Sequence, residues 1–252
     1  MIKKQTYNPE LGRFTTEDPA KDGLNWYVYC GNNPVMFIDP IGLKLMLNGD
    51  EESQNEILKQ LQKLTDNKLK LENGEVTISE YAKKEKLKSG NKLIKKLIDS
   101  EKVCSINLEK TDNCISGTHL YSRDDIENIS NGEGADCYIN FHINTELTIE
   151  VINPDTKLLE SKKRPSYIGL AHELIHAEHI MSGTSYGFTE KSKYIFVSGR
   201  TKILGIGLFY NFSWEINSKE ELATVGLLTY GNHEITENMI RSEHNLWLRG
   251  RY

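Results

Sequence analysis

The chain has 252 residues, of which 38% are hydrophobic and 27% charged, as in an ordinary globular protein of one large or two unequal domains. Its formal net charge of -5 supplies no basic surface for a nucleic acid. No stretch reaches the ~20 apolar residues that cross a bilayer, and residues 1–30 lack the apolar core of a signal peptide. We therefore expect no nucleic-acid or membrane partner, no signal peptide and no transmembrane segment.

Residues 1–43 differ in composition from the rest of the chain. They hold four of the six prolines, and many Gly, Asn and Asp residues separate short aromatic runs such as Trp26–Tyr29. This pattern is typical of turns between brief strands, and a segment of this length cannot bury a hydrophobic core alone. We predict that 1–43 is a piece of a larger β structure, separate from a domain at 44–252.

Four short motifs of this segment resemble the end of the Rhs/YD-repeat core. They are Tyr7–Phe14, Glu17–Pro19, Gly31–Val35 and Asp39–Leu43. In that family the repeats build a β cocoon around a C-terminal toxin, and an Asp-Pro-x-Gly-Leu motif marks the boundary, where self-cleavage follows the Leu. The resemblance implies an Rhs shell as a partner and Leu43–Lys44 as the cleaved bond. Because the repeats themselves are missing, we interpret 1–43 as a remnant of the shell.

From Lys44 onward the pattern predicts an α+β domain. Apolar residues at helical spacing predict helices, and alternating stretches predict strands. The lysine-rich stretch 83–96 fits the exposed face of a helix. The cysteines at 30, 104, 114 and 137 form no Cys-x-x-Cys pair, so we expect buried thiols, with a 104–114 bridge as the alternative. In chain order we expect a helix at 51–64, a hairpin at 68–79, a helix at 91–100, a strand at 103–108, a loop at 117–134 and a strand at 137–143.

The most informative motif is His-Glu-Leu-Ile-His at His172–His176, within the apolar stretch Ile168–Met181. On a helix, residues four apart lie on one face, so the two imidazoles can share one Zn²⁺ and Glu173 can act as a general base. Ser166 and Gly183 suit the start and the stop of this helix. The alternative interpretation is a pair of core histidines, which would be costly to desolvate.

A catalytic zinc needs a third protein ligand and keeps a fourth position for water. The longer metzincin motif, in which a Gly and a third ligand His follow the two motif histidines, does not fit, because His179 and Ser182 occupy those two positions. Ser218 and Glu221 have capping-box spacing, which would leave Glu220 free to bind metal. We expect His179 to be a partly exposed helix residue, with a place beside the ligands as the alternative. Weaker ligand candidates are Glu190, Glu215 and Glu234.

Two segments, His172–Ala177 and Glu220–Gly226, resemble the zinc-site segments of clostridial neurotoxin light chains. In that family the first Glu of Glu-Glu-Leu ligates zinc, and the second supports a ligand histidine from behind. The resemblance therefore implies Zn²⁺ bound by His172, His176 and Glu220. It also implies that Glu221 supports a ligand histidine on the side away from the metal. A carboxylate behind a metal-bound imidazole is also expected on physical grounds.

The C-terminal segment looks like the tail of NleD-like effector metalloproteases, which are delivered bacterial toxins that cut host signalling proteins. The matching residues are Thr236–Asn238, Arg241, Glu243 and Arg249–Tyr252. This resemblance covers most of 44–252. An Arg-x-x-Tyr pair in related zinc proteases stabilises the tetrahedral intermediate, and Arg249 and Tyr252 match that pair. One such oxyanion donor can be worth about 3 kcal/mol. The alternative is an ordinary charged terminus.

These patterns predict an α+β, zincin-like zinc endopeptidase at 44–252. The resemblances imply secretion or delivery into a target cell, an intracellular protein substrate and a cognate immunity protein. One alternative is an Rhs-associated toxin of another enzyme class. The sequence lacks the Pro-Cys-x-x-Cys motif of deaminases, and its net charge of -5 does not supply the basic cleft of a nuclease. The other is a binding module with a structural zinc, a kind of site usually closed by cysteines and four protein ligands.

Overall fold

The computed structural model describes the strands β1 (Tyr7–Asn8) and β2 (Arg13–Phe14), and residues 44–252 except 111–115, 123, 144–146, 188, 204–206 and 229–233. The chain divides into two compact units, Met1–Gly42 and Leu43–Tyr252. In the first unit, β1 and β2 pair antiparallel. The boundary motif Asp39–Leu43 and two of the four cysteines, Cys30 and Cys114, lie outside the described residues.

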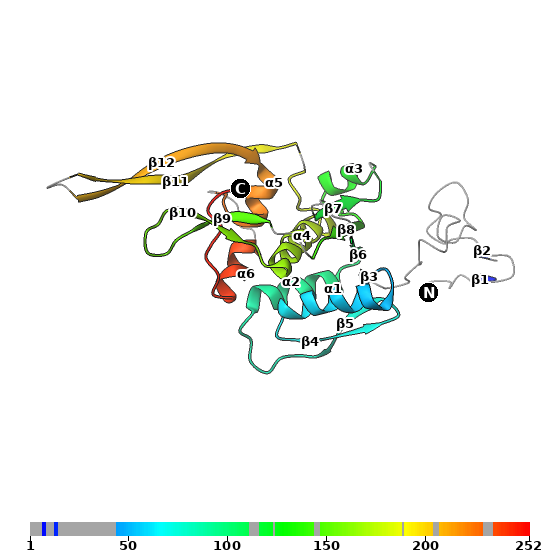
Figure 1. Cartoon of the computed structure of the whole chain (residues 1–252). Coiled ribbons are helices and arrows are strands. Elements are labelled where there is room, and N and C mark those ends of the chain that lie inside the picture. Colours follow the sequence, from blue (N-terminus) through cyan, green and yellow to red (C-terminus); the bar gives the residue numbers. More distant parts are fainter. Residues whose placement is uncertain are drawn as a thin grey trace. The chain divides into compact units, whose positions relative to one another are not determined.

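The second unit is an α+β domain, as predicted, and is built on a six-stranded sheet of order β4-β5-β3-β6-β8-β7 (Figure 1). The neighbours β3, β6 and β8 run parallel, and the other pairs are antiparallel. The hairpin predicted at 68–79 and the strands predicted at 103–108 and 137–143 are confirmed. The strands are β3 (Leu45–Leu47), β4 (Lys68–Glu72), β5 (Glu75–Glu80), β6 (Cys104–Leu108), β7 (Gly117–Leu120) and β8 (Cys137–Phe141).

The prediction of a loop over 117–134 was wrong. This stretch contains the edge strand β7, which pairs with β8, and the short helix α3 (Asp125–Ser130). In β7 only Thr118 is buried, so the strand lacks the apolar alternation that signals a half-buried strand. Its partner β8 supplies the backbone hydrogen bonds that hold the segment extended, and a polar edge strand is common in natural sheets.

Three helices pack with the sheet around one hydrophobic core. The predicted helices are confirmed as α1 (Glu51–Lys63) and α2 (Lys88–Asp99), and each buries one apolar stripe. The third helix, α4 (Ser166–Met181), contacts α1, α2, β7 and β8, and it is buried along most of its length. Since α4 lies inside the domain, any polar side chain that it carries must find a partner there.

Helix α2 begins at Lys88, three residues before the predicted start. The Glu243 carboxylate, from the far end of the chain, accepts hydrogen bonds from the backbone N–H groups of Ser89 at 2.6 Å and of Gly90 at 3.3 Å. These are N–H groups of the first turn, which have no partner within the helix. A cap supplied from 153 residues away cannot be read from the local sequence.

The remaining elements form two hairpins and two short helices. The long hairpin of β11 and β12 leads directly into α5, without a connecting loop (Figure 1). Among the described residues, no helix is long and apolar enough to cross a membrane. The described cysteines, Cys104 and Cys137, are buried free thiols, as expected, and face each other in register on β6 and β8. The elements are β9 (Thr148–Ile152), β10 (Leu159–Lys163), β11 (Lys191–Ile203), β12 (Gly207–Ser218), α5 (Lys219–Val225) and α6 (Glu237–Glu243).

Candidate metal centre

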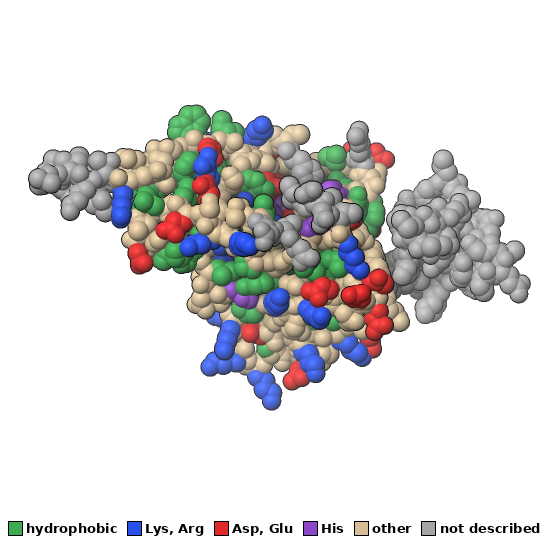
Figure 2. Space-filling model, in the orientation of Figure 1, with side chains coloured by type: hydrophobic (Ala, Val, Ile, Leu, Met, Phe, Trp, Pro, Cys, Tyr) green, Lys and Arg blue, Asp and Glu red, His purple; other side chains and the backbone are tan. Residues whose placement is uncertain are grey.

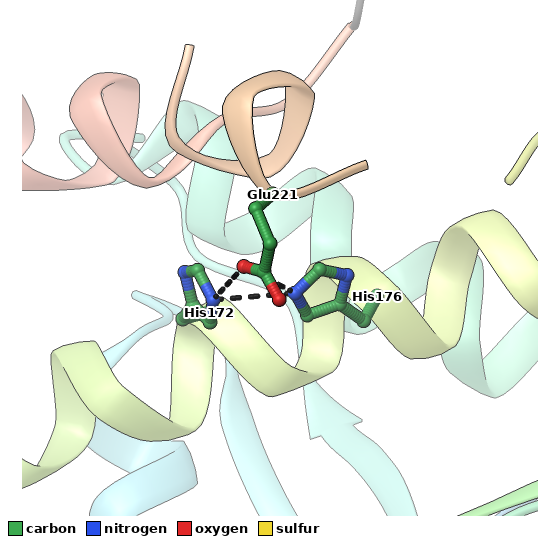
Figure 3. A group of neighbouring side chains, drawn as sticks. All are labelled: His172, His176 and Glu221. Carbon is green, nitrogen blue, oxygen red and sulfur yellow. Dashed lines mark hydrogen bonds and ion pairs between the residues drawn. The ribbon is translucent and has the colours of Figure 1, made fainter. Parts of the chain in front are cut away.

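Helix α4 carries the His172–His176 motif through the middle of the domain. It starts at Ser166 and ends at Met181, close to the predicted limits, and Gly183 follows with a φ of 68°. His172 and His176 are one helical turn apart and point to the same side, with exposed fractions of 3% and 6% (Figure 3). Their Nε2 atoms lie 3.2 Å apart. The helix therefore directs two imidazole nitrogens at one point.

Helix α5 supplies a carboxylate to the same point. The Oε2 atom of Glu221 lies 3.1 Å from the Nε2 of His172 and 3.2 Å from the Nε2 of His176 (Figure 3). One ligand atom from each of these three side chains lies within 4.8 Å of the others. Two imidazole nitrogens and a carboxylate oxygen form a donor set typical of zinc, and three protein ligands are typical of a catalytic site.

The outer nitrogens of the two imidazoles face two further carboxylates. The Nδ1 of His172 lies 3.0 Å from Oε2 of Glu237, at the start of α6. The Nδ1 of His176 lies 3.1 Å from Oε1 of Glu220. A carboxylate on the outer nitrogen fixes the tautomer and the ring orientation, so that the inner nitrogen is free to accept a metal.

The two glutamates of α5 are placed differently from the prediction, which gave the metal to Glu220 and the supporting position to Glu221. Glu220 is 2% exposed and its Oε2 accepts hydrogen bonds from the Ser185 hydroxyl at 3.0 Å and the Tyr186 N–H at 2.8 Å. Within the described part of the chain, the Ser218 hydroxyl makes no capping bond, so Glu221 is not in a capping box. Successive helix residues point about 100° apart, and the packing of α5 on α4 decides which of the two faces the histidines.

His179 is buried, with an exposed fraction of 3%, which corrects the expectation of a partly exposed residue. Its Nδ1 lies 2.7 Å from Oε1 of Glu220. His179 therefore belongs to the group that holds Glu220 behind His176. The weaker ligand candidates are engaged elsewhere: Glu190 with Lys219, Glu215 with Arg251, and Glu234 with Lys92 and Lys96.

Sequence reasoning placed Glu237 in the family-like C-terminal segment but gave it no role at the site. It is fully buried, and besides His172 it contacts Nη1 of Arg249 at 3.2 Å and Nη1 of Arg241 at 3.4 Å. The Thr236 hydroxyl accepts a hydrogen bond from the Met239 N–H and caps α6 at the preceding residue. The signal in the sequence was the Thr-Glu pair of a helix start, but nothing local connects that start to His172.

The electrostatics of the cluster are dominated by its carboxylates, which attract positive charge to the histidines. Burial alone would raise the pKa of Glu237, but its hydrogen bond with His172 lowers that pKa to about 2. Burial likewise opposes ionisation of Glu220 and Glu221, yet the neighbouring histidines hold both pKa values well below the usual range. Burial would lower the pKa of His176, and the carboxylates of Glu220 and Glu221 raise it to about 10. The carboxylates thus stay ionised and surround the histidines with negative charge.

Glu173 lies beside this donor set and is held by the edge strand β7. The Thr118 hydroxyl lies 2.9 Å from Oε2 of Glu173 and 3.0 Å from its backbone oxygen. Glu173 is 6% exposed, and its charge acts on both His176 and Tyr252. The carboxylate is therefore fixed next to the metal donors without being one of them.

The C-terminal segment folds back over the histidines. Arg249 bridges to Val151 of β9, and the Gly250 N–H donates to the Glu150 carbonyl at 3.0 Å. The Tyr252 ring is stacked on His172 with 6.2 Å between the ring centroids. Burial and the neighbouring Glu221 carboxylate raise the pKa of Tyr252 well above its ordinary value, so the phenol keeps its proton.

Arg249 is 8% exposed, and its Nε donates a hydrogen bond to the Arg251 carbonyl at 3.2 Å. Its guanidinium pairs with Glu237 and lies 4.4 Å above the centroid of the Tyr252 ring. The structure thus brings both residues of the predicted Arg-x-x-Tyr pair to the cluster. Of the two, Tyr252 lies over His172. Arg249 contacts the Tyr252 ring and the Glu237 carboxylate, which in turn contacts His172.

A family model, Peptidase_M91, described as "Effector protein", matches residues 43–252. No curated protein matches the chain. Among solved structures, the chain is similar to the Clostridium botulinum neurotoxin serotype F light chain, with 17% identity, a TM-score of 0.38, and coverage of 85% of this chain and 56% of that one. It is also similar to the botulinum neurotoxin serotype C1 light chain protease, with 11% identity, a TM-score of 0.30, and coverage of 67% and 39%. The chain thus spans little more than half of the first of these proteins and less than half of the second.

Proposed function

The chain belongs to the Peptidase_M91 family of effector proteins, and from this premise we propose that residues 44–252 are a zinc-dependent endopeptidase that is delivered into a target cell and cleaves a protein there. The observation that carries the proposal is the convergence of His172, His176 and Glu221 on one point, with a buried acid, Glu173, beside them. An immunity protein over the cleft and an Rhs shell around the toxin are the partners that fit this role.

We assign the metal to His172, His176 and Glu221. The donor set fits Zn²⁺, because each imidazole has a carboxylate on its outer nitrogen, as metal-binding histidines usually have. Zinc held there would act as a Lewis acid toward the scissile carbonyl and lower the pKa of a water molecule. A structural zinc fits less well, since such sites usually have cysteine ligands, and the described cysteines face each other between β6 and β8.

The acid–base work falls to Glu173. Its carboxylate takes a proton from the attacking water as the water oxygen bonds to the carbonyl carbon, and then gives that proton to the leaving amine as the peptide bond breaks. The Thr118 hydroxyl holds the carboxylate in place through both steps. Tyr252, which keeps its proton, donates a hydrogen bond to the oxyanion, and Arg249 positions the phenol ring.

The proposal is tested by metal analysis and peptide cleavage. The purified chain should retain about one zinc per molecule after dialysis. It should also cut peptides in a library prepared from a whole-cell lysate, with the cut sites identified by mass spectrometry. Removal of zinc by a chelator should stop cleavage, and readdition should restore it. A chain that neither holds nor takes up zinc, or a zinc-loaded chain that cuts no peptide, would contradict the proposal.

We expect Tyr252→Phe to lower kcat by roughly 10²–10³-fold on the best-cleaved library peptide, because it removes one donor to the oxyanion. KM and zinc content should change little, since Phe keeps the ring over His172 and under Arg249. The matched control is Tyr81→Phe, because Tyr81 is an exposed tyrosine that directly follows β5. A kcat close to that of the wild type would leave Tyr252 as a packing residue only.

A further inference from the structure

The outer face of the long hairpin carries a row of exposed apolar side chains, with the Lys193 ammonium 3.9 Å from the centroid of one of them, the Trp214 ring. On β12 the alternate residues Phe212, Trp214 and Ile216 are 67%, 58% and 60% exposed. Ile195, the register partner of Trp214 on β11, is 68% exposed. Figure 2 shows hydrophobic side chains along the upper edge of the molecule, over this hairpin. A sheet with one covered face normally carries polar residues outside, so this face is typical of a surface that binds something.

A groove of about 410 Å³ adjoins this face. One wall is the β11–β12 hairpin, and the other is the β9–β10 hairpin. Its lining is almost entirely apolar and includes Ile195, Val197, Phe212, Ile152, Leu159 and Gly250. Trp214 and Ile216 share the outer face of the hairpin but do not line the groove. The groove is therefore a concave apolar site set beside a flat apolar surface, as in many sites that hold a side chain of a bound polypeptide.

The groove is preformed. The Arg251 guanidinium donates to Glu150 of β9 at 3.0 Å and to Glu215 of β12 at 3.1 Å, and so it ties the two walls together. At the base, a Cβ on Gly250 would lie 2.5 Å from Ile152 and 2.6 Å from Leu159. A side chain at residue 250 would force Ile152 and Leu159 to shift, because these two apolar residues close over its backbone.

One residue of the groove lining, Gly250, is close along the chain to residues of the metal centre. Gly250 follows Arg249 directly and is two residues from Tyr252, a separation of at most about 7 Å along the chain. A polypeptide that lay in the groove would therefore pass within a few residues of the side chains proposed to act on the peptide bond.

We propose that this groove is a specificity subsite that takes a large apolar or aromatic side chain of an extended polypeptide substrate, a few residues from the scissile bond. The outer face of the hairpin extends the contact along the substrate chain. The proposal rests on the proposed protease function. A concavity between two braced hairpins fits one chain better than a flat membrane, which would meet the protruding face and leave the groove empty.

The test compares Phe212→Ser, in the groove, with Ile216→Ser, a matched control on the same face and strand with similar exposure. The bait is zinc-loaded Glu173→Gln protein, which is expected to be inactive and therefore to leave the peptides intact. It is applied to an array of peptides in which each position is varied in turn. We expect binding to favour large apolar residues at one position. Phe212→Ser should weaken binding of those peptides roughly 10-fold and leave peptides with Ser at that position unchanged, while Ile216→Ser keeps the preference.

Cleavage of the lysate-derived library by the active protein gives an independent result. Cut sites should share a large apolar residue at one fixed offset, and the Phe212→Ser variant should lose that enrichment. If the array shows the preference but no peptide is cut, the groove stands as a peptide site and the protease function falls. Binding without apolar preference, or a preference that survives Phe212→Ser, overturns the groove proposal. So does a Phe212→Ser protein that loses binding only to phosphatidylserine-containing vesicles, because the face would then be a membrane contact.

Discussion

Glu173→Gln should keep the zinc and cleave the best library peptide about 10²–10⁴-fold more slowly, since general acid–base catalysis contributes that factor and Gln can neither take up nor return the proton. Gln retains an oxygen that can accept the hydrogen bond from Thr118, so the fold and the metal donors should be undisturbed. The measurements are kcat/KM, zinc content and the circular dichroism spectrum of both proteins.

Glu178→Gln is the matched control for this variant. Glu178 lies on the same helix but faces away from the metal centre and pairs with Lys96 at 2.7 Å. We expect it to cleave at nearly the wild-type rate. If Glu173→Gln retained more than about one tenth of the wild-type activity, a water molecule or another side chain would have to serve as the base, and the role given to Glu173 would be withdrawn.

The sequence alone predicts the part of the site that depends on local periodicity. His172 and His176 are four residues apart in an apolar run, and the length of that run predicts a buried helix with both imidazoles on one side. The confirmed helix α1 and the 68–79 hairpin follow from the same kind of local pattern, helical spacing and an Asn-Gly turn.

Features that depend on distant partners could not be predicted. The edge strand β7 is extended because β8 pairs with it, and its own polar residues give no strand signal. The early start of α2 depends on Glu243, and the orientation of His172 depends on Glu237, both of which lie on α6. In each case the local chain permits several conformations, and a tertiary hydrogen bond selects one of them.

The order of the two α5 glutamates is the clearest example. Both residues are acidic and adjacent, so composition and spacing cannot decide which of them meets the metal. The rotation of α5 about its own axis decides it, and the hydrogen-bond donors around Glu220 fix that rotation. These donors are Ser185, Tyr186, His179 and Thr224. Glu221 is the more exposed of the two, with 27% of its side chain accessible, as suits a ligand that solvent can reach.

Glu221→Gln should therefore lose zinc affinity by more than Glu220→Gln does. A group behind a ligand histidine typically contributes 10–100-fold to metal affinity or activity, which is the loss expected for Glu220→Gln. The loss for Glu221→Gln should exceed this range, because the variant replaces the anionic oxygen that completes the donor set with a neutral amide. Competition with a fluorescent zinc chelator measures both affinities under one set of conditions.

Thermal unfolding with and without zinc separates the two roles. Zinc should raise the Tm of the wild type and of Glu220→Gln, and the Tm increase should nearly disappear in Glu221→Gln, since only a bound ligand stabilises the folded chain by mass action. In metal-free protein, Glu220→Gln should lower the Tm more than Glu221→Gln, because it leaves the half-buried Tyr186 N–H and the buried His179 with a weaker acceptor. The opposite order in both measurements would return the metal to Glu220, and with it the arrangement that the family resemblance implied.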